Sequence, residues 1–153
     1  YRLYTYSLMN HFLKAYRELI LEYGSLGEYL RNNYVIDAFD AIEMITSYFA
    51  SRGIEVIVPK DTKSSCKRIC MFLRWMVRDN SPVDLGLWTF IDKRTLIMPM
   101  DTHVLQEACS MGFLNSRSAS MSAARKLTAK MAEIFPDDPL KGDFALFGYG
   151  VDK

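Results

Sequence analysis

The sequence predicts an all-α fold, and three observations support this prediction. Apolar residues recur every three or four positions in several long segments, as they do when one face of a helix packs against a core. Good N-capping residues, among them Asp37 and Asp101, stand directly before such segments. Residues 54–58 could form a strand, but no second strand is available to pair with it, so we interpret them as an extended or short helical connector.

Four helices are predicted in the first half of the chain, over residues 2–22, 26–30, 38–51 and 66–78. Gly24 and Ser25 end the first helix, and Asp37 caps the third. The hydroxyls of Ser64 and Ser65 are expected to cap the fourth. The bulky aromatic residues in and after this helix are expected in the core: Phe72, Trp75 and Trp88.

The second half is predicted to begin with short helical turns and to continue with three helices. The turns cover residues 83–88 and 92–97. One helix lies between Asp101 and Gly112, and the next opens at Ser118 or Ser120 and runs to residue 134. A final helix over residues 140–147 follows the sequence Asp-Asp-Pro.

Length and composition place the chain among compact domains. Its 153 residues suit one domain, and 50% of them are hydrophobic, which is enough for a large core. No apolar run approaches the ~20 residues that cross a bilayer, and the start lacks a signal-peptide pattern, so we expect a cytoplasmic protein without a membrane partner. The three cysteines are expected as buried free thiols. Because the chain starts on Tyr1, we interpret it as a fragment or as a processed chain.

The net charge of +1 gives only a weak overall attraction to nucleic acid, but basic residues gather locally. Six basic residues and one acid lie between residues 60 and 78. Three of them, Lys67, Arg74 and Arg78, share one helix face at offsets of seven and eleven residues. This stripe either faces solvent or pairs with buried acids. The patch is compatible with phosphate contact, and a plain solvated face is the alternative.

Two stretches carry a resemblance to a known superfamily. PMDTHVL, residues 99–105, resembles the V-D-x-H-V/I signature of the helix-hairpin-helix DNA glycosylases, which include endonuclease III and the 8-oxoguanine DNA glycosylases. KRICMFLR, residues 67–74, resembles the K-E-A-S-H-F-L-R stretch of a microbial 8-oxoguanine glycosylase branch, where it carries the catalytic lysine. The longer string KRICMFLRWMVRDNSPVDLGLW is similar to an uncharacterised bacterial family, common in the Bacteroidetes, of the same superfamily.

The resemblance implies a single two-lobed helical domain over residues 1–153, with a helix-hairpin-helix core at about residues 38–112. It implies a DNA repair glycosylase and AP lyase that excises a damaged base, with an oxidised purine expected, from double-stranded DNA. Lys67 would attack the sugar C1′, and Asp101 would stabilise the positive charge that develops there. Lys63, which lies nearer the usual hairpin position, is the competing nucleophile.

The chain departs from the superfamily pattern in its hairpin. The usual L-P-G-x-G-x-K sequence brings backbone N–H groups to a DNA phosphate, whereas residues 58–67 contain no glycine. Lysine side chains and serine hydroxyls are expected to replace some of those contacts. The predicted DNA-binding residues are Lys60, Lys63, Ser64, Ser65, Arg68 and His103.

Two further departures concern spacing and cofactors. The separation between Lys67 and Asp101 is about twice that of typical members, and we interpret residues 79–97 as an insertion. The four-cysteine iron–sulfur signature is absent, so no cofactor or metal is expected. A monomer is favoured.

The residues also allow simpler interpretations. Taken alone, Asp101 is a helix cap, Lys67 a surface lysine and His103 an exposed histidine. Two alternative functions follow: a non-catalytic helix-hairpin-helix module that binds nucleic acid, and a helical protein-interaction domain. The most informative observation is the distance between the Lys67 amine and the Asp101 carboxylate, and whether the two groups share a cavity wide enough for a nucleobase.

Overall fold

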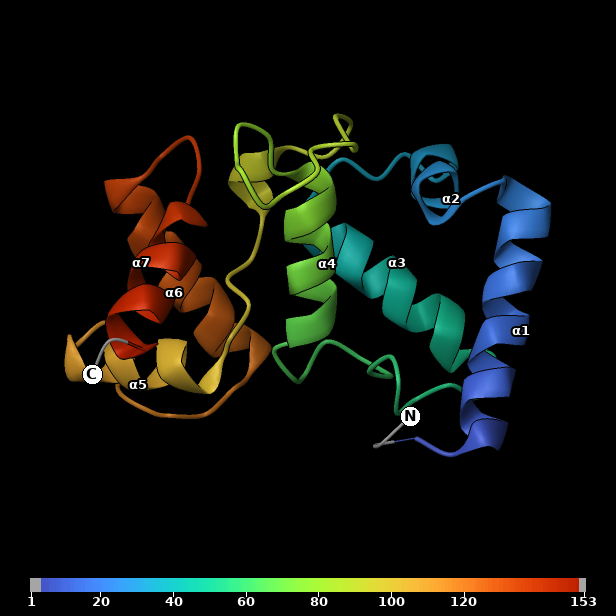
Figure 1. The fold of residues 1–153 in the computed structure, drawn as a ribbon, viewed down its shortest axis with the longest axis horizontal. Helices are drawn as coiled ribbons and strands as arrows, with labels where there is room; N and C mark the ends of the chain where they lie inside the picture. The colour runs from blue at the N-terminus through green and yellow to red at the C-terminus, as the bar shows by residue number, and fades with distance from the viewer. Residues whose placement is uncertain (1–3, 152–153) are drawn as a thin grey trace.

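The computed structural model describes residues 4–151, and this part of the chain is helical and contains no strand. Figure 1 shows α1 and α2 at one end of the molecule, α3 and α4 in the middle, and α5, α6 and α7 at the other end. The all-α prediction is confirmed. The elements are α1 (Tyr6–Tyr23), α2 (Leu26–Asn32), α3 (Ala38–Ala50), α4 (Lys67–Val77), the 3-10 helix η1 (Lys93–Thr95), α5 (Thr102–Ser110), α6 (Met121–Ile134) and α7 (Lys141–Val151).

One cluster of buried apolar side chains connects the helices. Leu19 of α1, Ile42 of α3 and Leu73 of α4 belong to it, as do Val104 of α5 and Leu127 of α6. Burial of this continuous apolar surface is the main force that holds the helices together. In the described part of the chain, no helix has the length and apolar character needed to cross a membrane.

Most predicted helix ends are confirmed. Asp37 caps α3 by accepting hydrogen bonds from the Phe39 and Asp40 N–H groups. Ser120, one of the two expected alternatives, caps α6. Gly24 ends α1 with a φ of 82°, a conformation that side chains disfavour. The first helix begins at Tyr6, after the cap Thr5, rather than near the start of the chain.

The predicted cap of α4 is wrong. The helix begins after Cys66, whose backbone is left-handed (φ 46°, ψ 38°), and no side chain caps it. The Ser64 hydroxyl accepts a hydrogen bond from the Cys66 N–H, 3.4 Å away and outside the helix. The Ser65 N–H donates to the Ala119 carbonyl at 3.0 Å. The segment before α4 is therefore fixed by contacts with a distant part of the chain, which local capping rules do not consider.

These contacts join the start of α4 to the start of α6. An isolated antiparallel bridge pairs Ser64 with Ser120, and the Met121 N–H donates to the Lys63 carbonyl at 3.3 Å. The first residue of α4, Lys67, follows directly. Its position therefore depends on how the loop packs against α6.

The predicted helical turn over residues 83–88 is also wrong, because this segment is an irregular loop. The Leu85 N–H donates to the Trp75 carbonyl at 2.7 Å, and the Trp88 N–H donates to the Met76 carbonyl at 2.7 Å. The loop thus uses carbonyls that the end of α4 leaves without partners. Trp88 is buried as expected, whereas the Trp75 residue is 44% exposed.

The basic stripe of α4 pairs with acids. Arg74 contacts Asp84 at 3.2 Å and Asp143 at 2.6 Å, and Arg78 contacts Asp84 at 2.9 Å and Asp138 at 2.8 Å. All of these side chains are nearly buried. The Phe144 ring lies 4.7 Å and 4.9 Å from the two guanidinium carbons. This ion-pair network holds α4 against α7 and against the loop after α4.

Close packing of α7 against α6 leads to a stability prediction at Gly142. A Cβ added there would lie 2.3 Å from the Met131 sulfur and 2.6 Å from its Cγ. Because Met131 is buried, we expect Gly142→Ala to lower the free energy of unfolding by about 1–3 kcal/mol. Urea unfolding measures this. The control is Gly148→Ala in the same helix, where no atom lies within 4 Å, and it should be neutral or stabilising by up to about 1 kcal/mol. Equal stability of the two variants would contradict the packing argument.

Candidate active site

The structure brings Lys67 and Asp101 together across 34 residues of sequence. Lys67 is the first residue of α4, and Asp101 is the N-cap of α5. The Lys67 amine donates a hydrogen bond to Oδ2 of Asp101 and forms an ion pair with it. The lysine side chain is 45% exposed and that of the aspartate 23% exposed, so the pair remains accessible from solvent.

Asp101 is held in its charged form. Its Oδ1 accepts a hydrogen bond from the His103 backbone N–H at 3.0 Å. The hydrogen bond from Lys67 lowers the pKa of Asp101 below its ordinary value, and the His103 N–H lowers it further against the opposing effect of burial. Asp101 is therefore negatively charged at neutral pH. Its carboxylate lies beside the Lys67 amine, where it can stabilise a positive charge on a bound group.

Lys67 and Asp101 line one cavity of about 210 Å³. Met71 of α4 and Phe144 and Phe147 of α7 supply apolar surface to the same cavity, which also contains Pro99, Arg74 and Asp143. Liquid water occupies about 30 Å³ per molecule, so the space holds a small group, and it is smaller than the roughly 300–1,000 Å³ of drug-sized ligand sites. The cavity thus combines an amine, a carboxylate and flat apolar walls.

A second carboxyl group in this cavity, that of Asp143, has a pKa shifted in the opposite direction. The Asp143 side chain is nearly buried, and burial raises the pKa of Asp143 while the Arg74 guanidinium opposes that rise. The charge of Asp101 raises it further. One cavity therefore contains two carboxyl groups whose pKa values are shifted in opposite directions, an arrangement typical of sites in which each has a different role.

The predicted DNA-binding residues fall into two groups. Lys60, Lys63, Ser64, Arg68 and His103 are exposed, in the loop before α4 or in the first turns of α4 and α5.

The prediction that Ser65 binds DNA is wrong, because the residue is only 5% exposed and its N–H donates a hydrogen bond to the Ala119 carbonyl. A buried residue that fixes the loop presents no hydroxyl to DNA. We therefore remove Ser65 from the DNA-binding set.

Lys63, the competing nucleophile, lies in a different environment. Its side chain is 92% exposed, and its amine lies 3.9 Å from Asp61. Lys67, by contrast, contacts Asp101, and both residues line the cavity. The geometry thus favours Lys67 as the reactive amine.

The histidine next to the site lies at its edge. The His103 ring meets the Phe147 ring edge-to-face, with centroids 6.0 Å apart. Since Phe147 lines the cavity, His103 is on the adjoining surface.

Sequence reasoning missed the α7 side of the cavity. Phe144 and Phe147, three residues apart, share a helix face. The same spacing is typical of a face buried in the core, so it does not indicate a cavity wall. Arg74 was recognised as part of the basic stripe, whereas nothing local indicates that Asp143 is its partner.

Cysteine, histidine and acidic side chains are the usual protein ligands of metal ions. In the described part of the chain, no group of three or more His, Cys, Asp or Glu side chains is placed to hold a metal ion. Cys66 and Cys70 are buried free thiols, as expected, whereas the free thiol Cys109 is only partly buried. Burial raises the pKa of Cys70 to about 12. Cys70 is therefore a poor nucleophile.

Comparison with known proteins identifies one family. A family described as "Protein of unknown function (DUF2400)" matches residues 1–152. No curated protein and no solved structure matches the chain.

Proposed function

Because the chain belongs to the DUF2400 family of proteins of unknown function, we propose its activity from the site: a DNA repair glycosylase with associated AP lyase activity. The observation that carries the proposal is the Lys67–Asp101 pair, which lines a cavity that also has flat apolar walls. An amine supplies a nucleophile for a sugar carbon, and a fixed carboxylate stabilises the cation that forms.

The proposed reaction begins when a damaged nucleotide is flipped out of the duplex. The ammonium group of Lys67 first gives up a proton to solvent, since only the free amine is nucleophilic. Its Nζ then forms a bond to C1′ while the bond from C1′ to the base breaks. The electron pair leaves with the base, which takes up a proton. Nζ then carries two protons and gives up one of them, and the sugar ring opens as its oxygen takes up a proton, which gives a protonated Schiff base. Loss of a C2′ proton and departure of the 3′ phosphate by β-elimination then cleave the strand.

The cavity offers complementary surfaces to a flipped base. Met71, Phe144 and Phe147 present apolar groups to the flat faces of a ring, and Arg74 and Asp143 lie among the lining residues as polar groups for its edge. We propose that the excised base is an oxidised purine. The pKa of Asp101 is lowered and that of Asp143 is raised. This difference supports separate roles, with Asp101 in charge stabilisation and Asp143 in base recognition.

The surface beside the cavity supports duplex binding. Lys60, Lys63, Ser64 and Arg68 are exposed at the start of α4. That helix start has no side-chain cap, and helix N-termini attract phosphate. Left-handed Cys66 provides a backbone conformation that glycine often supplies, so the glycine-free stretch of residues 58–67, at the start of α4, is proposed to act as the hairpin.

The test uses a purified protein and duplexes that contain 8-oxoguanine, an abasic site or only normal bases. We expect release of the oxidised base, strand cleavage, and a covalent protein–DNA complex that appears only with borohydride. If no base is released and no covalent complex is trapped on any of these duplexes, the proposal is wrong. Salt-dependent binding without turnover would instead support the non-catalytic module, which the absence of glycine from residues 58–67 favours.

The role of Asp101 can be tested separately from its structural role. Asparagine also caps helices well, so Asp101→Asn should retain α5 while it removes the negative charge. We expect single-turnover excision to fall by roughly 10²–10³-fold, the scale found for lost electrostatic stabilisation of a transition state. Thermal unfolding and DNA binding should change little. Asp92→Asn, at the exposed cap of η1, is the control and should keep full activity. Full activity of Asp101→Asn would exclude the proposed role.

A further inference from the structure

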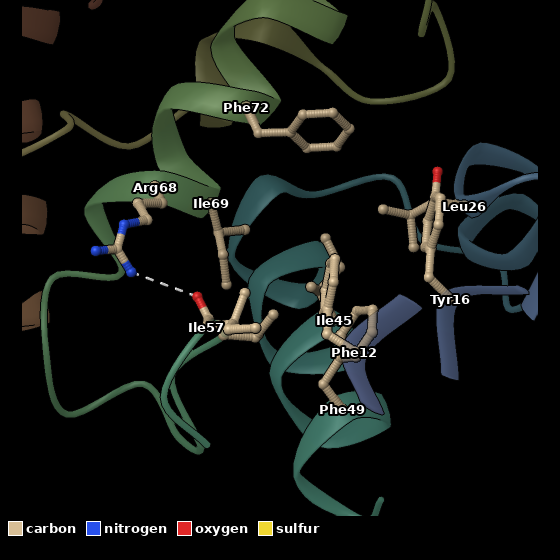
Figure 2. Close-up of a pocket in the computed structure, with 10 residues that line it drawn as sticks. Phe12, Tyr16, Leu26, Ile45, Phe49, Ile57, Arg68, Ile69 and Phe72 are labelled. Carbon is tan, nitrogen blue, oxygen red and sulfur yellow. Dashed lines mark hydrogen bonds between the residues drawn. The ribbon is translucent and has the colours of Figure 1, made fainter. Parts of the chain in front are cut away.

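A second cavity, of about 310 Å³, lies on another face of α4 (Figure 2). It is lined by residues of α1, α2, α3 and α4 and of the connector before Pro59. Neighbouring positions of a helix point about 100° apart, and Lys67 and Arg68 accordingly line different cavities. The same is true of Met71 and Phe72. The second cavity is therefore distinct from the proposed catalytic site.

The walls of this cavity are almost entirely apolar. Figure 2 shows aromatic rings around the hollow, with Phe72 on one side and Phe12 and Phe49 on another. The Phe12 ring packs 5.2 Å from the Phe49 ring and 6.2 Å from the Tyr16 ring. Ile57 and several other aliphatic residues complete the lining. Its volume lies at the lower end of the range for small-molecule sites, which are mostly apolar with a few polar groups.

Arg68 is the one charged residue among those that line this cavity. Its Nη1 lies 3.5 Å from the Ile57 carbonyl oxygen, which is a long hydrogen bond, and its guanidinium carbon lies 5.7 Å from the centre of the Tyr4 ring. Among residues 4–151, no carboxylate lies within ion-pair distance of it, whereas Arg74 and Arg78 on the same helix each contact two acids. The charge of Arg68 is therefore available to an anionic ligand.

We propose that this cavity binds a small amphipathic carboxylic acid. Its apolar body packs against Phe12, Phe49 and Phe72, and its carboxylate pairs with the guanidinium of Arg68. The volume suits an acid of about eight to ten carbons rather than a long lipid. A nucleotide fits less well, because its several polar groups would meet apolar walls.

The test is calorimetric titration of the full chain with octanoate, octan-1-ol and octylammonium, which share one chain length and differ in charge. We expect octanoate to bind about tenfold more tightly than octan-1-ol, and octylammonium to bind most weakly. Butanoate should bind at least roughly tenfold more weakly than octanoate, because each buried methylene contributes to affinity. Equal affinity for acid and alcohol, or no binding of octanoate at millimolar concentration, would overturn the proposal.

A variant pair locates the site. Arg68→Gln changes an exposed side chain and should abolish the preference for octanoate over octan-1-ol. Arg117→Gln, an equal change of charge at an exposed position in the loop before α6, should retain it. Loss of the preference in both variants, or octanoate-induced chemical shift changes away from Phe12 and Phe72, would refute the assignment. Arg68 is also in the proposed DNA-binding set, but this test uses no nucleic acid, so the two proposals can fail separately.

Discussion

Replacing Lys67 with glutamine is expected to abolish the borohydride-trapped complex and to slow base excision by at least roughly 10³-fold. The substitution removes the only atom proposed to form a bond with C1′, and loss of a catalytic nucleophile has effects of this order or larger. Glutamine keeps a similar length and an N–H donor for Asp101. Because the lysine side chain is 45% exposed, the fold should persist. Single-turnover excision assays and denaturing gels of trapped complexes measure the effect.

The matched control is Lys63→Gln, four positions earlier. Its side chain is 92% exposed and lies near Asp61, so trapping should continue in this variant. A modest loss of DNA affinity and a weaker dependence of binding on salt are expected, since the substitution removes one proposed phosphate contact. If Lys63→Gln prevented trapping while Lys67→Gln did not, the assignment of the nucleophile would be wrong.

The second large effect concerns stability and is expected at Asp84. Its carboxylate bridges Arg74 and Arg78, and the aspartate side chain is fully buried. Asp84→Ala leaves two nearly buried guanidinium groups with one acid each, and removal of one partner from a buried ion pair costs about 3–5 kcal/mol. A loss of this size should lower Tm by about 10 °C for a protein of this length. Thermal and urea unfolding provide the measurement.

An ion pair in the same loop supplies the control. Asp79 contacts Lys93 at 2.6 Å, and both side chains are substantially exposed. Asp79→Ala should therefore change the free energy of unfolding by less than about 1 kcal/mol. If Asp84→Ala were as mild as Asp79→Ala, the network would add little to stability.

Most helices could be predicted from the sequence, because their determinants are local. The side chains of Asp37 and Asp101 bond N–H groups two or three residues away, and Gly24 adopts its conformation within its own turn. The pairing of Lys67 with Asp101 was expected only from the resemblance, since no local rule joins positions so far apart.

The wrong predictions concern segments that distant contacts control. Ser64 and Ser65 were expected to cap α4, but the start of α6 holds them in a bridge. Residues 83–88 were expected to be helical, but their N–H groups bond to the end of α4. In both segments, contacts outside the segment determine the backbone conformation, and periodicity contains no information about them.

The cavity wall from α7 was missed for a related reason. Phe144 and Phe147 have the spacing of an ordinary buried face, and Asp143 looks like a surface acid at a helix start. Only the packing of α7 beside α4 and α5 gives these side chains a shared surface with Lys67.

The loop after α4 has a consequence for attempts to shorten the chain. Residues 79–97 were interpreted as an insertion, which suggests a segment that engineering could delete. Yet Leu85 and Trp88 satisfy carbonyls of Trp75 and Met76, and Asp84 neutralises two arginines of the same helix. A trimmed protein would expose the last turn of α4 and lose the countercharge that allows its arginines to be buried. The segment is therefore an integral part of the scaffold around the cavity, and a minimal version of the protein must keep it.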